Sequence, residues 1–155
     1  MQLSRSFSLS ELTRSDVAAR RGWNNAPGPD TIDNLRALCV YVLQPLRDAL
    51  GRPLRVNSGF RSGPVNRAAG STIASQHVLG EAADIECAGV PNLRLAQTIL
   101  DLGLPFDQLI LEFHVVGEPS SGWVHVSHRR EAEQRGEVMR AIRLPGGVSY
   151  LPGLS

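Results

Sequence analysis

Apolar residues recur with a helical period over one long stretch of the chain, from Asp30 to Leu50. The apolar positions in this stretch are Ile32, Leu35, Leu38, Cys39, Val42, Leu43, Leu46 and Leu50. Because they are three or four residues apart, they line one face of a predicted helix, which Asp30 or Thr31 can cap and Gly51 can end. Pro45 interrupts the pattern and predicts a bend in this helix.

Other segments predict shorter helices. The S-x-x-E spacing at residues 8–11 is that of a capping box, and it predicts a short helix over about residues 8–20. The apolar periodicity of residues 91–102 predicts another helix. Residues 63–69 fit a helical turn, which a glycine- and serine-rich loop follows as far as His77.

Five short apolar segments predict strands, over residues 54–58, 82–87, 108–113, 123–127 and 138–144. Helices that are followed mostly by strands indicate the α+β class. The tail after residue 144 is rich in glycine and proline, and we expect turns there with no obvious anchor. Without an internal repeat or an interdomain linker, residues 1–155 predict a single domain.

The composition narrows the classes of function. Sixteen basic and fifteen acidic side chains give a net charge of +1, so there is no electrostatic case for a nucleic acid or an anionic membrane as partner. All sixteen basic residues are arginine, and the absence of lysine excludes Schiff-base catalysis and the phosphate-binding P-loop. No apolar run approaches the roughly 20 residues that cross a membrane.

The N-terminus and the cysteines add two smaller expectations. The first residues, M-Q-L-S-R-S-F-S, lack the apolar core of a secretory signal, so we expect synthesis in the cytoplasm. Cys39 and Cys87 lie in apolar surroundings without metal-type spacing, which predicts packed thiols and neither ligands nor a disulfide.

Two histidines and one aspartate are candidates for a metal site. Asp84 lies in the second predicted strand, on the face opposite Ile85, and His125 is central in the fourth. His77 lies in the loop just before the strand of Asp84, so two adjacent strands and this loop can bring the three side chains to one ion. Three protein ligands with a fourth position open to water are typical of a catalytic zinc site.

Three short motifs surround these residues in order. They read S-G-F-R-S at residues 58–62, S-Q-H-V-L-G-E-A-A-D at residues 75–84 and W-V-H at residues 123–125. Together they resemble the motifs S-G-[YF]-R-S, S-x-H-x-x-G-x-A-x-D and W-x-H of the zinc D-alanyl-D-alanine carboxypeptidase family. That family shares its fold with phage peptidoglycan endopeptidases and the Hedgehog signalling domain. The resemblance spans about residues 7–128, with a motif core at about 54–128.

The resemblance implies a fold, a cofactor and roles for site residues. The implied fold is a small antiparallel sheet that bears the zinc site, with helices packed on one side. His77, Asp84 and His125 are the implied ligands of one zinc ion per chain. Arg61 would bind a carboxylate or carbonyl of the substrate near the scissile bond, because its planar fork can hold two oxygens. Ser75 would hydrogen-bond the peptide. A salt-bridging arginine and a loop-capping serine are the alternatives for these two residues.

The general base is open between two acids. Some family members carry an acid three residues before the last histidine ligand, where this chain has Gly122. Glu112 resembles the acid that a family subgroup places at the end of the preceding strand, and strand alternation directs it to the zinc face. Glu118 lies in a turn-rich loop, so we expect Glu112 to be the base.

Two histidines lie outside the implied ligand set. His114 is close enough to Glu112 along the chain to line a cleft, and its role is open. His128 alternates away from His125 and precedes the polar run R-R-E-A-E-Q-R, which predicts a surface position.

The resemblance implies hydrolysis of a peptide bond in peptidoglycan stem peptides, as a D-Ala-D-Ala carboxypeptidase or an endolysin-type endopeptidase. We expect a monomer, without membrane insertion, that acts at the bacterial cell wall or periplasm. The alternatives are a non-catalytic zinc-binding relative and a structural component of the cell wall or a virion. A different metallopeptidase class is disfavoured because the chain has no H-E-x-x-H motif.

Overall fold

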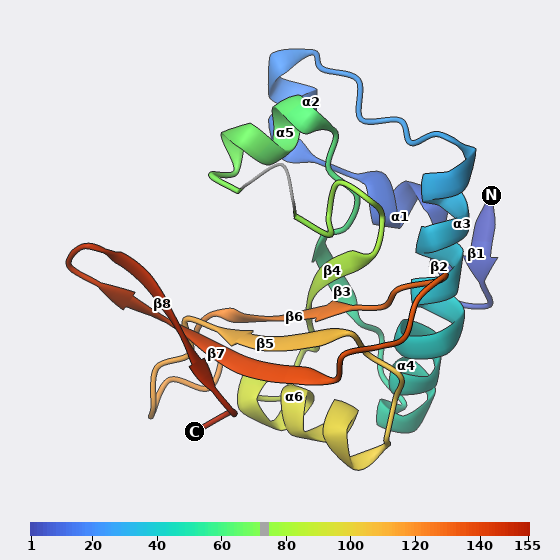
Figure 1. Ribbon diagram of the computed structural model, residues 1–155. Coiled ribbons are helices and arrows are strands. Elements are labelled where there is room, and N and C mark those ends of the chain that lie inside the picture. Colours follow the sequence, from blue (N-terminus) through green and yellow to red (C-terminus); the bar gives the residue numbers. More distant parts are fainter. Residues whose placement is uncertain (72–74) are drawn as a thin grey trace.

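The computed structural model describes residues 1–71 and 75–155 and has an α+β architecture, which confirms the predicted class (Figure 1). The helices are α1 (Leu9–Thr13), α2 (Asp16–Arg21), α3 (Pro29–Leu38), the π-helix η1 (Cys39–Leu43), α4 (Gln44–Leu50), α5 (Gly63–Ala68) and α6 (Asn92–Asp101). The strands are β1 (Gln2–Ser4), β2 (Phe7–Ser8), β3 (Arg55–Ser58), β4 (Ala82–Glu86), β5 (Gln108–Glu112), β6 (Trp123–Ser127), β7 (Glu137–Leu144) and β8 (Gly147–Pro152).

The main sheet has the strand order β3-β4-β6-β5-β7-β8. Its pairings are antiparallel, as the family resemblance implied, except that β5 and β7 run parallel. The parallel pair arises because the chain leaves β6 and crosses past β5 before it re-enters the sheet. This crossover places the β7–β8 hairpin at the far edge of the sheet from β3 (Figure 1).

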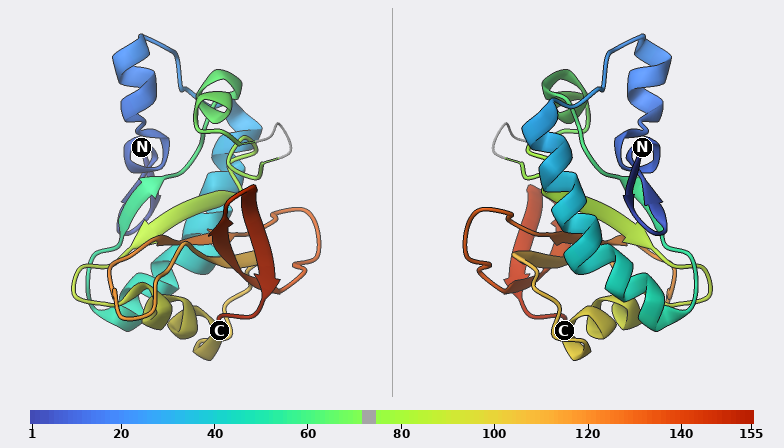
Figure 2. Two further views of the ribbon diagram at one scale, coloured as in Figure 1. Left: turned by 90° about the vertical axis from the view of Figure 1, so that its left-hand side faces the viewer. Right: turned by 90° about the vertical axis from the view of Figure 1, so that its right-hand side faces the viewer.

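The α3–α4 run and α6 cover one face of the sheet, as expected, and leave the other face for the site (Figure 1 and Figure 2). The α3–α4 run lies across the sheet, with α6 beside it (Figure 2). Side chains that alternate to the helical face form the core with the helices, among them Ala83 and Ile85 of β4, Leu109 and Leu111 of β5, and Val124 and Val126 of β6. Burial of this apolar face is the main stabilising contribution to the fold.

The long helix differs from the prediction at its start. Gly28 is the N-cap and Pro29 the first helical residue, so neither Asp30 nor Thr31 caps it. A proline fits at the first position because its missing N–H has no intrahelical acceptor there. A bend was predicted at Pro45, and the helix is irregular there because a π-helical turn directly precedes the proline. In this turn the Gln44 amide donates to the carbonyl of Cys39. The wider turn makes room for the proline ring, and the helix continues to its predicted end at Gly51.

The N-terminal helix forms as two pieces. Ser8 and Glu11 make the predicted capping box of α1, but α1 ends at Thr13. Ser15 then caps a second helix, α2, by accepting from the amide of Ala18. A serine inside a helical pattern competes for backbone donors, which explains the break within the expected 8–20 helix.

Three strands were not expected from the sequence. β1 and β2 form a small separate sheet, and the glycine- and proline-rich tail forms β8. The expectation of turns alone after residue 144 is therefore wrong, because residues 147–152 pair along β7. Part of the loop expected between residue 69 and His77, namely residues 72–74, lies outside the described residues.

The prediction for the cysteines is confirmed and that for His128 is wrong. Cys39 and Cys87 are both free and buried, and burial raises the pKa of Cys39 to about 12. His128 is only 7% exposed, stacks on Tyr41 and hydrogen-bonds through Nδ1 to the carbonyl of Pro105. It follows the last residue of β6, so strand alternation no longer determines its direction. In residues 1–71 and 75–155, no helix is long and apolar enough to cross a membrane.

Candidate metal centre

Two neighbouring strands place Asp84 and His125 directly opposite each other. Asp84 of β4 pairs in register with His125 of β6, so both side chains emerge on the face that the helices leave free. Nδ1 of His125 lies 3.1 Å from Oδ1 of Asp84. Both side chains are buried, at 8% and 6% exposure, although they are polar. The register of this strand pair therefore brings together two of the three candidate ligands.

His77 reaches the same carboxylate oxygen from the turn that precedes β4. Its Nε2 is 3.3 Å from Oδ1 of Asp84. Its Nδ1 is 2.7 Å from the carbonyl oxygen of Gly59, which can only accept, so Nδ1 carries the hydrogen. Nε2 is then the ring nitrogen that faces the carboxylate. Gly59 of the S-G-F-R-S motif thus orients the His77 ring of the next motif.

The turn that carries His77 requires glycine at position 80. Gly80 has a φ of +73°, and a Cβ there would lie 2.7 Å from the side chain and from the carbonyl oxygen of Thr31 on α3. No other residue type combines that backbone conformation with so close an approach. The glycine of the S-x-H-x-x-G pattern therefore holds the His77 turn against the long helix.

Arg61 takes the second oxygen of the same aspartate. Its Nη2 donates to Oδ2 of Asp84 at 3.1 Å, and its Nε donates to Oγ of Ser58 at 2.9 Å. Asp84 therefore directs Oδ1 to the two imidazoles and Oδ2 to the guanidinium. Burial by itself would raise the pKa of the Asp84 carboxyl, but His77 and His125 outweigh it and hold that pKa well below the ordinary value.

The three side chains fit a divalent metal ion. One ligand atom from each of His77, Asp84 and His125 can be chosen so that all lie within 4.8 Å of one another, and all three residues are buried. The lone pair of His77 and the carboxylate would repel each other unless a proton or a cation lay between them. With Zn–N and Zn–O bonds of about 2.0–2.1 Å, tetrahedral ligand atoms lie about 3.3 Å apart, close to the 3.1 and 3.3 Å observed.

An acid shares the cleft with this cluster. The cleft has a volume of about 780 Å³, and its lining includes the three side chains together with Glu112 at the end of β5. Burial is the larger of two causes that raise the pKa of Glu112 to about 6, and the negative charge of Asp84 is the second. A carboxyl group with such a pKa can accept and release a proton near neutral pH.

Comparison with known proteins identifies the family. A family model described as Peptidase M15 matches residues 5–127, about four fifths of the chain. The chain belongs to the peptidase M15 family. This family of zinc peptidases includes D-Ala-D-Ala carboxypeptidases, so the resemblance drawn from the three motifs is confirmed. A comparison with curated proteins gives no match.

The M15 chain has no room for an acid at position 122. Gly122 has a φ of +68°, and a Cβ there would lie 1.8 Å from the carbonyl oxygen of Glu112. The backbone of the Glu112 turn thus occupies the space that a side chain at this position would need. Glu118, the other acid considered, is exposed, and neither it nor His114 is among the described residues that line the cleft. His114 instead pairs with Ser121 at 3.3 Å.

Ser75 and a buried carboxylate support the His77 turn. Oγ of Ser75 accepts from the backbone amide of His77 at 3.3 Å, and the residue lines the cleft. The next residue, Gln76, donates from Nε2 to Oδ2 of Asp107 at 3.0 Å. Asp107 is fully buried and is also held by the guanidinium of Arg135. Sequence reasoning missed Asp107, because nothing adjacent to it distinguishes it from a loop acid.

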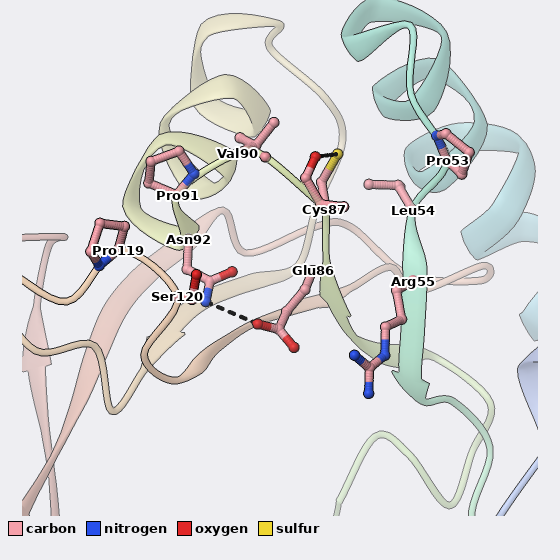
Figure 3. A pocket seen from close by; sticks show the side chains of 12 residues that line it. Pro53, Leu54, Arg55, Glu86, Cys87, Val90, Pro91, Asn92, Pro119 and Ser120 are labelled. Atoms are coloured by element: carbon pink, nitrogen blue, oxygen red, sulfur yellow. Dashed lines mark hydrogen bonds between the residues drawn. The ribbon is translucent and has the colours of Figure 1, made fainter.

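A second hollow lies beyond the cluster, at the ends of β3 and β4 (Figure 3). Its volume is about 590 Å³, and the side chains of Arg55 and Glu86 project into it. Glu86 already accepts hydrogen bonds from Asn57 and Asn92. Within the described residues it contains no group of possible metal ligands, so the chemistry is concentrated in the larger cleft.

Proposed function

We propose that this chain is a zinc-dependent peptidase that hydrolyses a peptide bond in the stem peptides of peptidoglycan. The observation that supports the proposal best is the presence, in one cleft, of three convergent ligand side chains and the acid Glu112. A purely structural metal site needs no such acid. Membership of the peptidase M15 family supports the same reaction class.

In this proposal each residue has one task. His77, Asp84 and His125 would hold a zinc ion, which would supply Lewis-acid chemistry and lower the pKa of water toward ~7. Glu112 takes the proton of the attacking water and returns it to the departing amine as the C–N bond breaks. Its pKa of about 6 leaves it ionised, and so able to accept that proton, at neutral pH.

Arg61 and Ser75 act on the substrate. Arg61 has five N–H donors, and three of them are used: Nε donates to Ser58, Nη1 to Asn66 and Nη2 to Asp84. A remaining N–H can stabilise the negative charge that develops on the substrate carbonyl oxygen. Ser75 accepts from the His77 amide, so its own hydroxyl hydrogen is left to donate to the peptide.

Hydrolysis of stem peptides would place the site of action at the bacterial cell wall. We propose that the chain acts as a monomer.

Mass spectrometry of purified muropeptides tests the function and finds the bond. Wild-type protein loaded with zinc should release a defined fragment, and chelator should stop the release. The matched control is the Glu112→Gln variant, which should retain zinc and release nothing. Cleavage that persists in strong chelator, or at the wild-type rate in Glu112→Gln, would rule out this scheme.

A further inference from the structure

The β7–β8 hairpin forms one wall of the cleft although it lies outside the part of the chain that the family model matches. The match ends at residue 127, and the hairpin runs from Glu137 to Pro152. Four of its side chains line the cleft, and they alternate along the strands: Met139, Arg143, Val148 and Tyr150. Any selectivity that this wall confers is therefore specific to chains that carry such a hairpin.

The apolar side chains of this wall are exposed to solvent. Val148 is 47% exposed and Tyr150 is 55% exposed, although both are on the cleft side of β8. Ala141 links Tyr150 to Glu112, because Ala141 pairs with Glu112 on one side and with Tyr150 on the other. An extended peptide that reaches Glu112 can therefore lie along these two side chains.

Among the described residues, Arg143 is the one arginine of the cleft that forms no ion pair, although its charge favours the ionised form of Glu112. Three arginines line the cleft. Arg61 is paired with Asp84 and Arg135 with Asp107, whereas Arg143 forms no ion pair. Its guanidinium carbon lies 3.9 Å from the centre of the Phe113 ring, which leaves the edge of the guanidinium free to donate.

Phe113 is itself held in place firmly. It has a φ of +56°, which is uncommon for any residue other than glycine, and its ring meets the Trp123 ring edge to face at 5.4 Å. Such a conformation persists only where the surroundings enforce it. The stack of Trp123, Phe113 and Arg143 thus presents a preorganised positive charge on the cleft wall.

We propose that Arg143 binds a carboxylate of the substrate, so that the enzyme selects an acidic peptide. The inference rests on the proposed peptidase function. On β7, Arg143 is four residues beyond Met139, which lies in the same row as His125 and Asp84. Strand geometry separates the backbone positions of Met139 and Arg143 by roughly 13 Å. Because an extended peptide also advances about 3.3 Å per residue, the carboxylate belongs to a residue a few positions from the scissile bond.

Binding to the zinc-loaded Glu112→Gln protein tests this inference without turnover. The probes are a soluble stem peptide and the same peptide with its side-chain carboxylates converted to amides, compared by calorimetry. The acidic peptide should bind about 10- to 100-fold more tightly, because a charge-assisted hydrogen bond is lost in the amide. Adding Arg143→Gln should remove this preference, and adding Arg94→Gln, which alters an exposed arginine of α6, should retain it.

A third variant separates charge from packing. Arg143→Lys keeps the charge but loses the planar fork, so it should keep part of the preference even if its contact with Phe113 weakens. Equal binding of the two peptides, binding of neither, or a preference that survives Arg143→Gln would overturn the inference. Muropeptide hydrolysis by the wild-type protein is measured separately, so failure of the peptidase function is distinguishable from failure of the Arg143 assignment.

Discussion

Arg61 and Asp84 form a part-buried ion pair in which Nη2 of the arginine lies 3.1 Å from Oδ2 of the aspartate. The other oxygen of Asp84 faces both imidazoles. The arginine therefore orients a candidate metal ligand and also lines the cleft where substrate would bind. Partners of this kind fix the direction of a ligand and raise metal affinity.

Substitution of Arg61 should lower both the rate of catalysis and the affinity for zinc. We expect Arg61→Ala to lower kcat about 100- to 1,000-fold, because one donor to the developing oxyanion is lost. Zinc affinity should fall roughly 10-fold, because Asp84 loses its partner. Steady-state kinetics and zinc titration measure the two effects. An increase in KM alone, with kcat unchanged, would instead make Arg61 a ground-state binding group.

The raised pKa of Glu112 predicts the acid limb of the pH–rate profile. The base must be ionised to take a proton from water, so kcat/KM should increase with pH through an apparent pKa of about 6. Below that pH the protonated carboxyl cannot act as the base. Initial rates between pH 5 and pH 8, at saturating zinc, provide the measurement. A profile that is flat from pH 5 to pH 8 would contradict the role of Glu112.

The same shift predicts that Glu112 destabilises the metal-free protein. Its pKa in the folded state, about 6, exceeds the ordinary value of 4.5, so folded protein holds the proton more tightly than unfolded protein. Stability is therefore lost as the pH increases from 4.5 to 6, and the full cost remains above that range. In chelator, Glu112→Gln should increase the free energy of unfolding by about 1–2 kcal/mol at pH 8.

The pH dependence of this gain is its internal control. Near pH 4, where Glu112 is protonated in both states, the variant and the wild-type protein should unfold at similar urea concentrations. A gain that is the same at both pH values would mean that the effect comes from packing and not from the charge.

Replacement of Asp107 should be costly although this acid lies in a loop. Its side chain is fully buried and accepts from Gln76 and from both the backbone and the guanidinium of Arg135. Asp107→Asn should lower the free energy of unfolding by about 2–4 kcal/mol, since partners are left without a charge to satisfy them. Urea denaturation measures this. The matched control is Asp101→Asn, an exposed acid on α6, which should change stability by less than about 0.5 kcal/mol.

Much of the fold and the metal cluster followed from local sequence patterns. Period-two alternation put Asp84 on the face opposite Ile85, and the strand 123–127 placed His125 on the matching row. The helical period located the long helix, and the motifs indicated the turn that carries His77. These features depend on residues near one another in the chain, or on motifs that the whole family shares.

The tertiary structure decided what depends on contacts between distant segments. The pairing of β8 along β7, the burial of Asp107 under Arg135 and the stacked position of His128 each involve a partner that no local pattern specifies. The same holds for Arg143, which nothing in the sequence distinguishes from the other fifteen arginines. Only the crossover that brings β7 beside β5 places that charge over Phe113 and inside the cleft. Local periodicity determines which face a side chain occupies, whereas strand order determines what that face meets.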